Sequence, residues 1–192
     1  MRGVVFPPEI RSVSATVEDT FGFAETQLVS FADLYAGKLV AALDRQHPRD
    51  LFDVRYLFAN EGIDAALFRA FLVYIISHGR PAHEVLRPAF KDIAQTFEQE
   101  FVGMTIEPAS LDDLLEARRQ LVAEIQHRLA DDRVRAFLMS FHELQPDWSA
   151  LGLDNIADLP AVRWKLINLE RLRAEQPAKY QSVVKDLDRV LK

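Results

Sequence analysis

The 192-residue sequence contains no cysteine, which excludes disulfide bonds, thiolate metal sites and cysteine nucleophiles. Glycine is also scarce, with seven residues, and such a composition favours helix. No apolar run reaches the ~20 residues that span a membrane, and no signal pattern is present, so we expect a soluble, cytoplasmic protein. The sequence has neither a serine elbow nor a Walker or Rossmann glycine pattern, and its five histidines lack the spacing of a zinc site.

What is present indicates one compact domain. Hydrophobic residues make up 49% of the chain and include 13 phenylalanines, enough for a sizeable aromatic core. The net charge is −6, from 23 basic and 29 acidic residues. An acidic balance of this kind argues against non-specific nucleic-acid binding, although a local basic patch remains compatible with it.

Hydrophobic periodicity predicts a mainly α fold: a bundle of about six to seven helices over residues 30–192. Residues 64–78 are apolar around most of their circumference and should form a central, buried helix. An amphipathic helix is expected over 88–101, after a connector at 80–88. Ser110 opens a long helix to about residue 130, whose arginines are expected on a solvated face.

The first 29 residues show the two-residue periodicity of β-strands. Residues 10–18 alternate between apolar and polar, which predicts a half-buried strand, and residues 23–29 predict its partner after a turn at 19–22. An isolated hairpin is only marginally stable, so it should lie against the helices or against something outside the chain. We therefore divide the chain into a short β segment, 1–29, and a helical domain, 30–192.

Residues 30–62 read as two helices joined by a tight corner, with Ser30 as N-cap and a break near residue 47. Lys38 and Arg45 share one face of the first helix, and Arg49 lies at the start of the second, where free N–H groups favour anions. These three cations could form a phosphate cradle. The same spacing also predicts the ion pairs Arg45–Asp50 and Arg49–Asp53, which is the simpler interpretation of charge spacing alone.

The segment from Lys38 to Asp53 has the pattern K-x-x-A-x-x-x-R-x-x-x-R-D-x-x-D. It resembles the corresponding segment of the AbiEii/AbiGii toxin family, nucleotidyltransferase-like proteins of bacterial type IV toxin–antitoxin and phage-defence (abortive infection) systems. Residues 101–105 and 159–169 are similar to the same family.

This resemblance implies a chemistry and a set of residues. It implies nucleotide transfer from an NTP, with Mg²⁺, to an acceptor such as RNA. Lys38 would be a catalytic residue that clamps phosphate together with Arg45 and Arg49, and Asp50 would be a supporting catalytic carboxylate. The family also implies a cognate antitoxin as partner, and RNA, including tRNA, is a further candidate.

The family's metal-binding Asp-x-Asp pair, which lies upstream of this motif, is not found before Lys38. We therefore expect the chain to represent the C-terminal portion of such a protein, and its strands to be a remnant of the nucleotidyltransferase sheet. We assign no metal ligand, and we expect no nucleotide transfer by this chain alone. The alternative is a non-catalytic helical module that binds a partner: a missing nucleotidyltransferase segment, another protein or RNA. The exposed strand edge near the N-terminus is a candidate dimer surface.

Two further sets of residues are open to more than one interpretation. Trp164, Lys165 and Asn168 could form a recognition patch, but aromatic residues on helices mostly pack in cores, so we expect Trp164 to be buried. His142 and Glu143 are expected to be surface polar residues.

Overall fold

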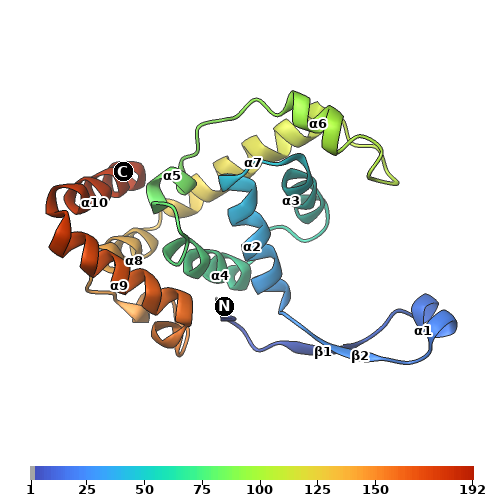
Figure 1. The fold of residues 1–192 in the computed structure, drawn as a ribbon, viewed down its shortest axis with the longest axis horizontal. Helices are drawn as coiled ribbons and strands as arrows, with labels where there is room; N and C mark the ends of the chain where they lie inside the picture. Colours follow the sequence, from blue (N-terminus) through green and yellow to red (C-terminus); the bar gives the residue numbers. More distant parts are fainter. Residues whose placement is uncertain (1–2) are drawn as a thin grey trace.

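The computed structural model describes residues 3–192, and over these residues the fold is mainly α, as predicted (Figure 1). They form ten α-helices and one two-stranded antiparallel sheet. Two of the ten, α1 with seven residues and α5 with five, were not predicted as helices, because their segments were assigned to a strand with its turn and to the connector at 80–88. None of the described helices is long and apolar enough to cross a membrane. The elements are β1 (Glu9–Ser12), α1 (Ala15–Phe21), β2 (Glu25–Leu28), α2 (Phe31–Asp44), α3 (Pro48–Asn60), α4 (Ala65–Ile76), α5 (Ala82–Leu86), α6 (Ala94–Glu100), α7 (Leu111–Leu129), α8 (Asp132–His142), the 3₁₀ turns η1 (Trp148–Ala150) and η2 (Ile156–Asp158), α9 (Pro160–Glu175) and α10 (Pro177–Leu191).

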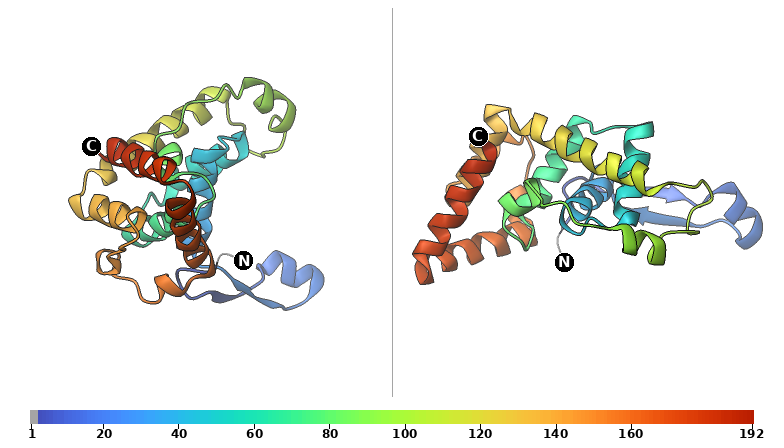
Figure 2. Two further views of the ribbon diagram at one scale, coloured as in Figure 1. Left: turned by 60° about the vertical axis from the view of Figure 1, so that its left-hand side comes forward. Right: turned by 90° about the horizontal axis from the view of Figure 1, so that it is seen from above.

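Helix α2 occupies the centre of the molecule and packs against α3, α4, α5 and α7 (Figure 1). Helices α9 and α10 form a pair at one end, where they meet α4, α5 and α8. The β1–α1–β2 segment projects from the helical body as an arm, and the two further views show the same projection (Figure 2).

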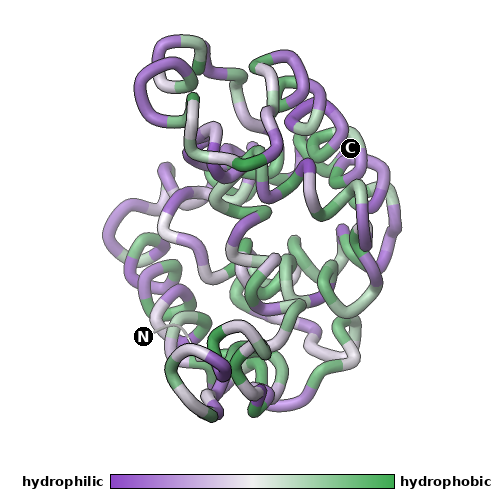
Figure 3. Tube along the Cα trace, turned by 90° about the vertical axis from the view of Figure 1, so that its right-hand side faces the viewer, coloured by the Kyte–Doolittle hydropathy of each residue, from purple (hydrophilic) through white to green (hydrophobic). Residues whose placement is uncertain are grey.

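The core is built from the apolar sides of these helices. Helix α4 is buried over most of its circumference, as predicted from its composition. The largest fully buried side chains include Phe71, Phe137 and Phe141. Green and purple alternate along the helical turns in Figure 3, so most helices have one apolar and one polar side.

The arm differs from the predicted half-buried hairpin. Its strands pair in an antiparallel register with Glu9 opposite Leu28, but each has only four residues, all of them exposed. Residues 15–18, predicted as strand, belong instead to helix α1, which ends at Gly22 with a φ of 89°. The prediction was wrong because the alternation of apolar and polar residues was interpreted as a strand with one buried face. Within residues 3–192 all residues of β1, α1 and β2 are exposed, so no buried face selects a strand over a helix here.

The base of the arm is held by Asp33, which is 1% exposed. Its carboxylate accepts the backbone N–H groups of Val5 and Phe6 at 2.8 and 2.9 Å. It also accepts the hydroxyls of Ser30 at 2.8 Å and Tyr74 at 3.2 Å. Asp33 therefore joins the segment before β1 to the start of α2 and to α4.

The connection before α6 is a second correction. Residues 88–101 were predicted as one helix, but α6 begins only at residue 94. The backbone of residues 89–91 hydrogen-bonds to the side chains of Gln46 and Arg118, which holds it in a non-helical conformation. These tertiary bonds outweigh the helical periodicity of the segment.

Candidate functional site

The corner between α2 and α3 forms where the sequence predicts it. Pro48 is the first residue of α3, and the His47 imidazole caps the helix by accepting the backbone N–H of Arg49 at 3.2 Å. Gln46 turns the chain with a φ of 57°, a left-handed conformation that is uncommon outside glycine.

The side chain of Gln46 also holds this corner in place through its hydrogen bonds. Its side chain, 1% exposed, donates to the carbonyl of Ala89 at 2.8 Å and accepts from the backbone N–H of Lys91 and from Arg118, both at 3.1 Å. Lys91 Nζ in turn donates to the carbonyl of Asp44, at the C-terminal end of α2, at 2.9 Å. The corner is therefore braced from α7 and from the 89–91 segment.

Lys38 reaches across from α2 to α3, where its Nζ donates to Asp53 Oδ2 at 2.5 Å. The two side chains are 31% and 34% exposed, so about two thirds of each is covered. The pair links the middle of α2 to the second turn of α3. The motif's first and last charged residues thus contact each other directly.

Arg45 forms the ion pair that charge spacing predicted. Its Nη2 lies 2.7 Å from Asp50 Oδ1. The Arg45 side chain is 65% exposed, whereas that of Asp50 is 11% exposed. The second carboxylate oxygen of Asp50 is buried and has no hydrogen-bond partner among the described residues. Asp50 is therefore a largely buried carboxylate that orients an exposed guanidinium.

Arg49 does not join the other two cations. Its Nη2 lies 3.7 Å from Glu100 Oε2 in α6, and His47 Nε2 lies 3.1 Å from the same oxygen. The predicted Arg49–Asp53 pair is absent from residues 3–192, because Asp53 binds Lys38 instead. The three cations therefore lie along one corner, each with its own carboxylate.

This arrangement suits an anion that competes for exposed guanidinium groups. Arg45 and Arg49 each use only part of their five N–H donors, and the N-terminus of α3 adds a partial positive charge. It does not suit a metal ion. Asp50 and Asp53 both bind basic side chains, and within residues 3–192 no three His, Asp or Glu side chains group as a metal would require. Asp50 and Asp53 are therefore not assigned as Mg²⁺ ligands.

Three residues that support the corner were missed. Gln46 and Glu100 gave no signal in the sequence, because neither stands at a helical spacing from its partner. Arg118 was expected on a solvated face of α7 but is 8% exposed, with its guanidinium 4.4 Å from the centre of the Phe90 ring. Burial lowers the pKa of Arg118.

Comparison with known proteins identifies the family. A family model described as the nucleotidyl transferase AbiEii toxin of a type IV toxin–antitoxin system matches residues 1–168. The chain belongs to the AbiEii family. No curated protein and no solved structure matches it.

Membership in the AbiEii family confirms the resemblance on which the motif interpretation rests. It places the chain among nucleotidyltransferase toxins, and the antitoxin is the partner that such a system implies. The matched region contains the whole α2–α3 corner and ends within α9.

The burial expected for Trp164 and the exposure expected for His142 were both wrong. Trp164 is 66% exposed instead of buried, because its side chain lies at the rim of a pocket instead of packing into the core. His142 is 1% exposed instead of lying on the surface. Both residues line the same pocket, together with Lys165 and Asn168.

Proposed function

We propose that this chain takes part in nucleotide transfer and that the α2–α3 corner holds the triphosphate of the donor nucleotide. The observation that supports this most directly is the exposure of the motif's arginines. The side chains of Arg45 and Arg49 are 65% and 57% exposed, although each has a carboxylate partner. Exposed ion pairs contribute only about 0–1 kcal/mol, so a triphosphate with several negative charges can displace them.

Lys38 and Asp50 take the more fixed roles in this proposal. Lys38, two thirds covered and held by Asp53, keeps its ammonium group in one position and is the proposed phosphate clamp of the transfer step. Asp50 is the supporting carboxylate, since it orients Arg45 from a largely buried position. Positioning and charge neutralisation supply most of the catalysis in phosphoryl transfer, and these residues would provide part of both.

The binding step is tested by titrating ATP, GTP, CTP and UTP into the protein and its variants by calorimetry. Arg45→Met and Arg49→Met should each weaken binding about three- to fivefold, and wild-type binding should weaken as salt rises. Arg171→Met is the matched control, because Arg171 is an exposed arginine that pairs with Glu175 on α9. Equal triphosphate affinity in all four proteins would leave only structural ion pairs at the corner.

The transfer step needs a separate assay. We expect the 192-residue chain to bind a triphosphate without transferring it, because its described acidic side chains do not form a metal site. The assay incubates the purified chain with Mg²⁺, each labelled nucleoside triphosphate and total tRNA. Label transfer that disappears in Lys38→Ala would show that this chain is a complete enzyme.

The biological setting is inferred from the family alone. The AbiEii description names a toxin of a type IV toxin–antitoxin system. We infer that the chain acts in the cytoplasm, in phage defence by abortive infection, with RNA as the nucleotide acceptor. Growth arrest is the expected phenotype when the chain is expressed together with a nucleotidyltransferase segment that supplies the metal site, and an antitoxin gene from the same locus should relieve it. Unimpaired growth at high expression of both would contradict this setting.

A second candidate function is favoured by the arm. All residues of β1, α1 and β2 are exposed, among them Ile10 at 72% and Phe21 at 83%, and Phe23, between α1 and β2, is 65% exposed. Exposed apolar side chains beside an open strand edge favour pairing with another chain. On this view the protein is a helical interaction module that dimerises through the arm.

Sedimentation equilibrium tests the dimer. We expect a dimer that dissociates in the double variant Ile10→Asp, Phe23→Asp. Tyr56→Asp is the control, since Tyr56 is an aromatic residue on α3 that is 56% exposed. A monomer at all concentrations, or a dimer that the arm variant leaves intact, would contradict this function.

A further inference from the structure

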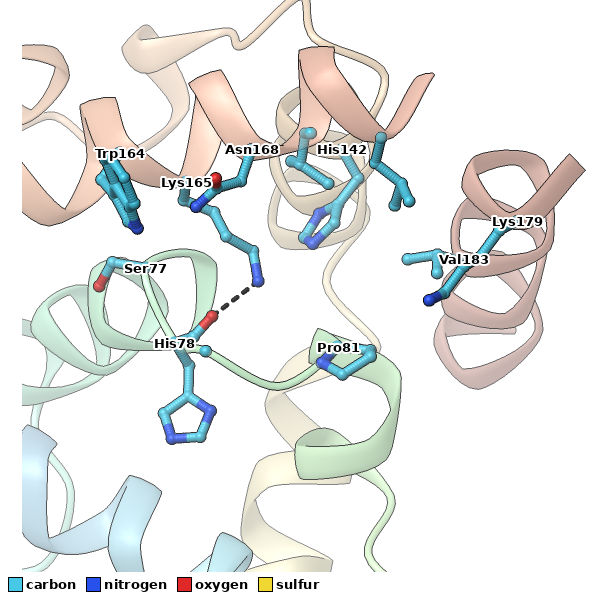
Figure 4. Close-up of a pocket in the computed structure, with 12 residues that line it drawn as sticks. Ser77, His78, Pro81, His142, Trp164, Lys165, Asn168, Lys179 and Val183 are labelled. Atoms are coloured by element: carbon cyan, nitrogen blue, oxygen red, sulfur yellow. Dashed lines mark hydrogen bonds between the residues drawn. The ribbon is translucent and has the colours of Figure 1, made fainter. Parts of the chain in front are cut away.

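A pocket of about 290 Å³ lies away from the corner, between the end of α4, the start of α5, and helices α8, α9 and α10 (Figure 4). Ligand pockets commonly measure about 300–1,000 Å³, so this one is at the small end and suits one planar ring system with its substituents. Figure 4 shows Trp164, Lys165 and His142 pointing toward the space between α9 and residues 77–81. The apolar part of the pocket lining includes Leu169, Leu172 and Val183.

His142 presents an unused hydrogen-bond acceptor to this pocket. Its Nδ1 lies 2.8 Å from the carbonyl oxygen of Leu138, which can only accept, so Nδ1 carries the proton. Its Nε2 is buried and has no partner among the described residues. Burial lowers the pKa of His142 to about 4, so the ring is neutral and Nε2 keeps its lone pair. A ligand that satisfies it must offer an N–H or O–H group.

The charged lining of the pocket has one sign. Lys165 Nζ donates to the carbonyls of His78 at 2.6 Å and Arg80 at 3.3 Å, which leaves one of its three N–H groups unused. Lys179, exposed on α10, makes no ion pair with any described residue, and no carboxylate lines the pocket. In a chain with a net charge of −6, this is a local preference for anions.

Trp164 adds a surface for a flat ring. It lies at the rim, 66% exposed, one residue from Lys165. An indole face stacks favourably on another aromatic ring. We propose that this pocket binds a small aromatic anion: one planar aromatic or heteroaromatic ring system, single or fused, that donates a hydrogen bond to His142 Nε2 and carries a phosphate or carboxylate for Lys165 and Lys179. Nucleoside monophosphates and hydroxylated aromatic acids share this chemistry.

The test titrates AMP, CMP, GMP, UMP, 4-hydroxybenzoate and inorganic phosphate separately into the full chain by calorimetry. At least one ring-bearing anion should bind with a Kd below about 1 mM, and inorganic phosphate should bind at least about tenfold more weakly. The identity of the binding probe distinguishes a nucleotide from an aromatic acid. Adenosine and 4-hydroxybenzyl alcohol, which carry no charge, should also bind more weakly than AMP and 4-hydroxybenzoate.

Two variants of exposed residues locate the binding without disturbing the core. Lys179→Met and Trp164→Ala should each weaken it about fivefold or more. Their controls are Lys185→Met and Ile167→Ala, exposed residues of the same two helices outside the pocket lining. Arg45→Met, at the α2–α3 corner, should leave this binding unchanged.

Three results would overturn the proposal. The first is no saturable binding of any ring-bearing anion at 10 mM, on the order of the weakest affinities that calorimetry resolves. The second is equal affinity for inorganic phosphate, which would remove the role of the ring. The third is unchanged affinity in both Lys179→Met and Trp164→Ala, which would place the bound anion elsewhere.

Discussion

Replacing Asp33 by alanine tests how the chain before the arm is held to the helices. The carboxylate accepts two backbone N–H groups, of Val5 and Phe6, and two hydroxyls, of Ser30 and Tyr74. The hydroxyls can turn toward other acceptors, but the two amides cannot. Leaving a buried donor unsatisfied costs about 1–3 kcal/mol. The amides belong to half-buried residues, so the lower half of that range applies, and we expect Asp33→Ala to lose about 3 kcal/mol in all.

The assay is urea unfolding followed by circular dichroism, with Asp64→Ala as the matched control. Asp64 is also an aspartate in an N-terminal capping position, but it is exposed and accepts one bond, from the N–H of Leu67 at 2.7 Å. Loss of such a cap costs about 1 kcal/mol. Hydrogen exchange at Val5 and Phe6 gives a second readout, because both amides should lose protection only in Asp33→Ala. Equal destabilisation in the two variants, with protection retained, would refute the reasoning.

Three further predictions concern other parts of the molecule. Burial lowers the pKa of His142 from 6.5 to about 4, so protonation of this residue opposes folding. The free energy of unfolding should be at its full value above about pH 6.5 and lower by about 2 kcal/mol at pH 5. His142→Gln should remove that loss, as measured by urea titrations at pH 5 and 7. A double-mutant cycle on Lys38 and Asp53, measured by urea unfolding, should give a coupling of only about 0.5–1 kcal/mol, because both side chains are about a third exposed. Phe71→Ala should cost about 3–5 kcal/mol in the same assay, since Phe71 is fully buried in α4.

The sequence predicts those parts of the fold that local signals determine. The capping box at Ser110 and Asp113 forms as expected, with both reciprocal bonds present. The prolines at 48, 160 and 177 each begin a helix. Such signals work because a cap or a proline acts within one helical turn, whatever the rest of the molecule does.

Where long-range contacts decide, the prediction fails. Residues 88–93 have a helical pattern, but Gln46 bonds to the backbone of residues 89 and 91, which are 43 and 45 positions away, and holds it in a non-helical conformation. Arg118 appears in the sequence as one of several surface arginines, and only the fold brings it to Gln46. At the candidate site, the Arg45–Asp50 pair follows from spacing, whereas the partner of Arg49 lies on α6 and could not be inferred.

The two basic sites differ in how their cations are neutralised, and this difference predicts what each one selects. Lys38, Arg45 and Arg49 all pair with carboxylates, so an anion at the corner must outcompete a negative charge that is already present. Binding there should rise steeply with ligand charge. Among residues 3–192 no carboxylate pairs with Lys179, so the pocket beside α9 should select for a ring and a hydrogen-bond donor instead.

ATP and AMP provide the direct comparison, because they share the ring and differ in charge. In calorimetric titrations Arg45→Met should weaken the binding of ATP more than that of AMP. Lys179→Met should weaken the binding of AMP more than that of ATP. Two independent sites require this crossed pattern, since each variant removes a contact from only one of them. If both variants weaken both ligands by the same factor, a single site binds them, and the corner and the pocket cannot both have the roles assigned to them here.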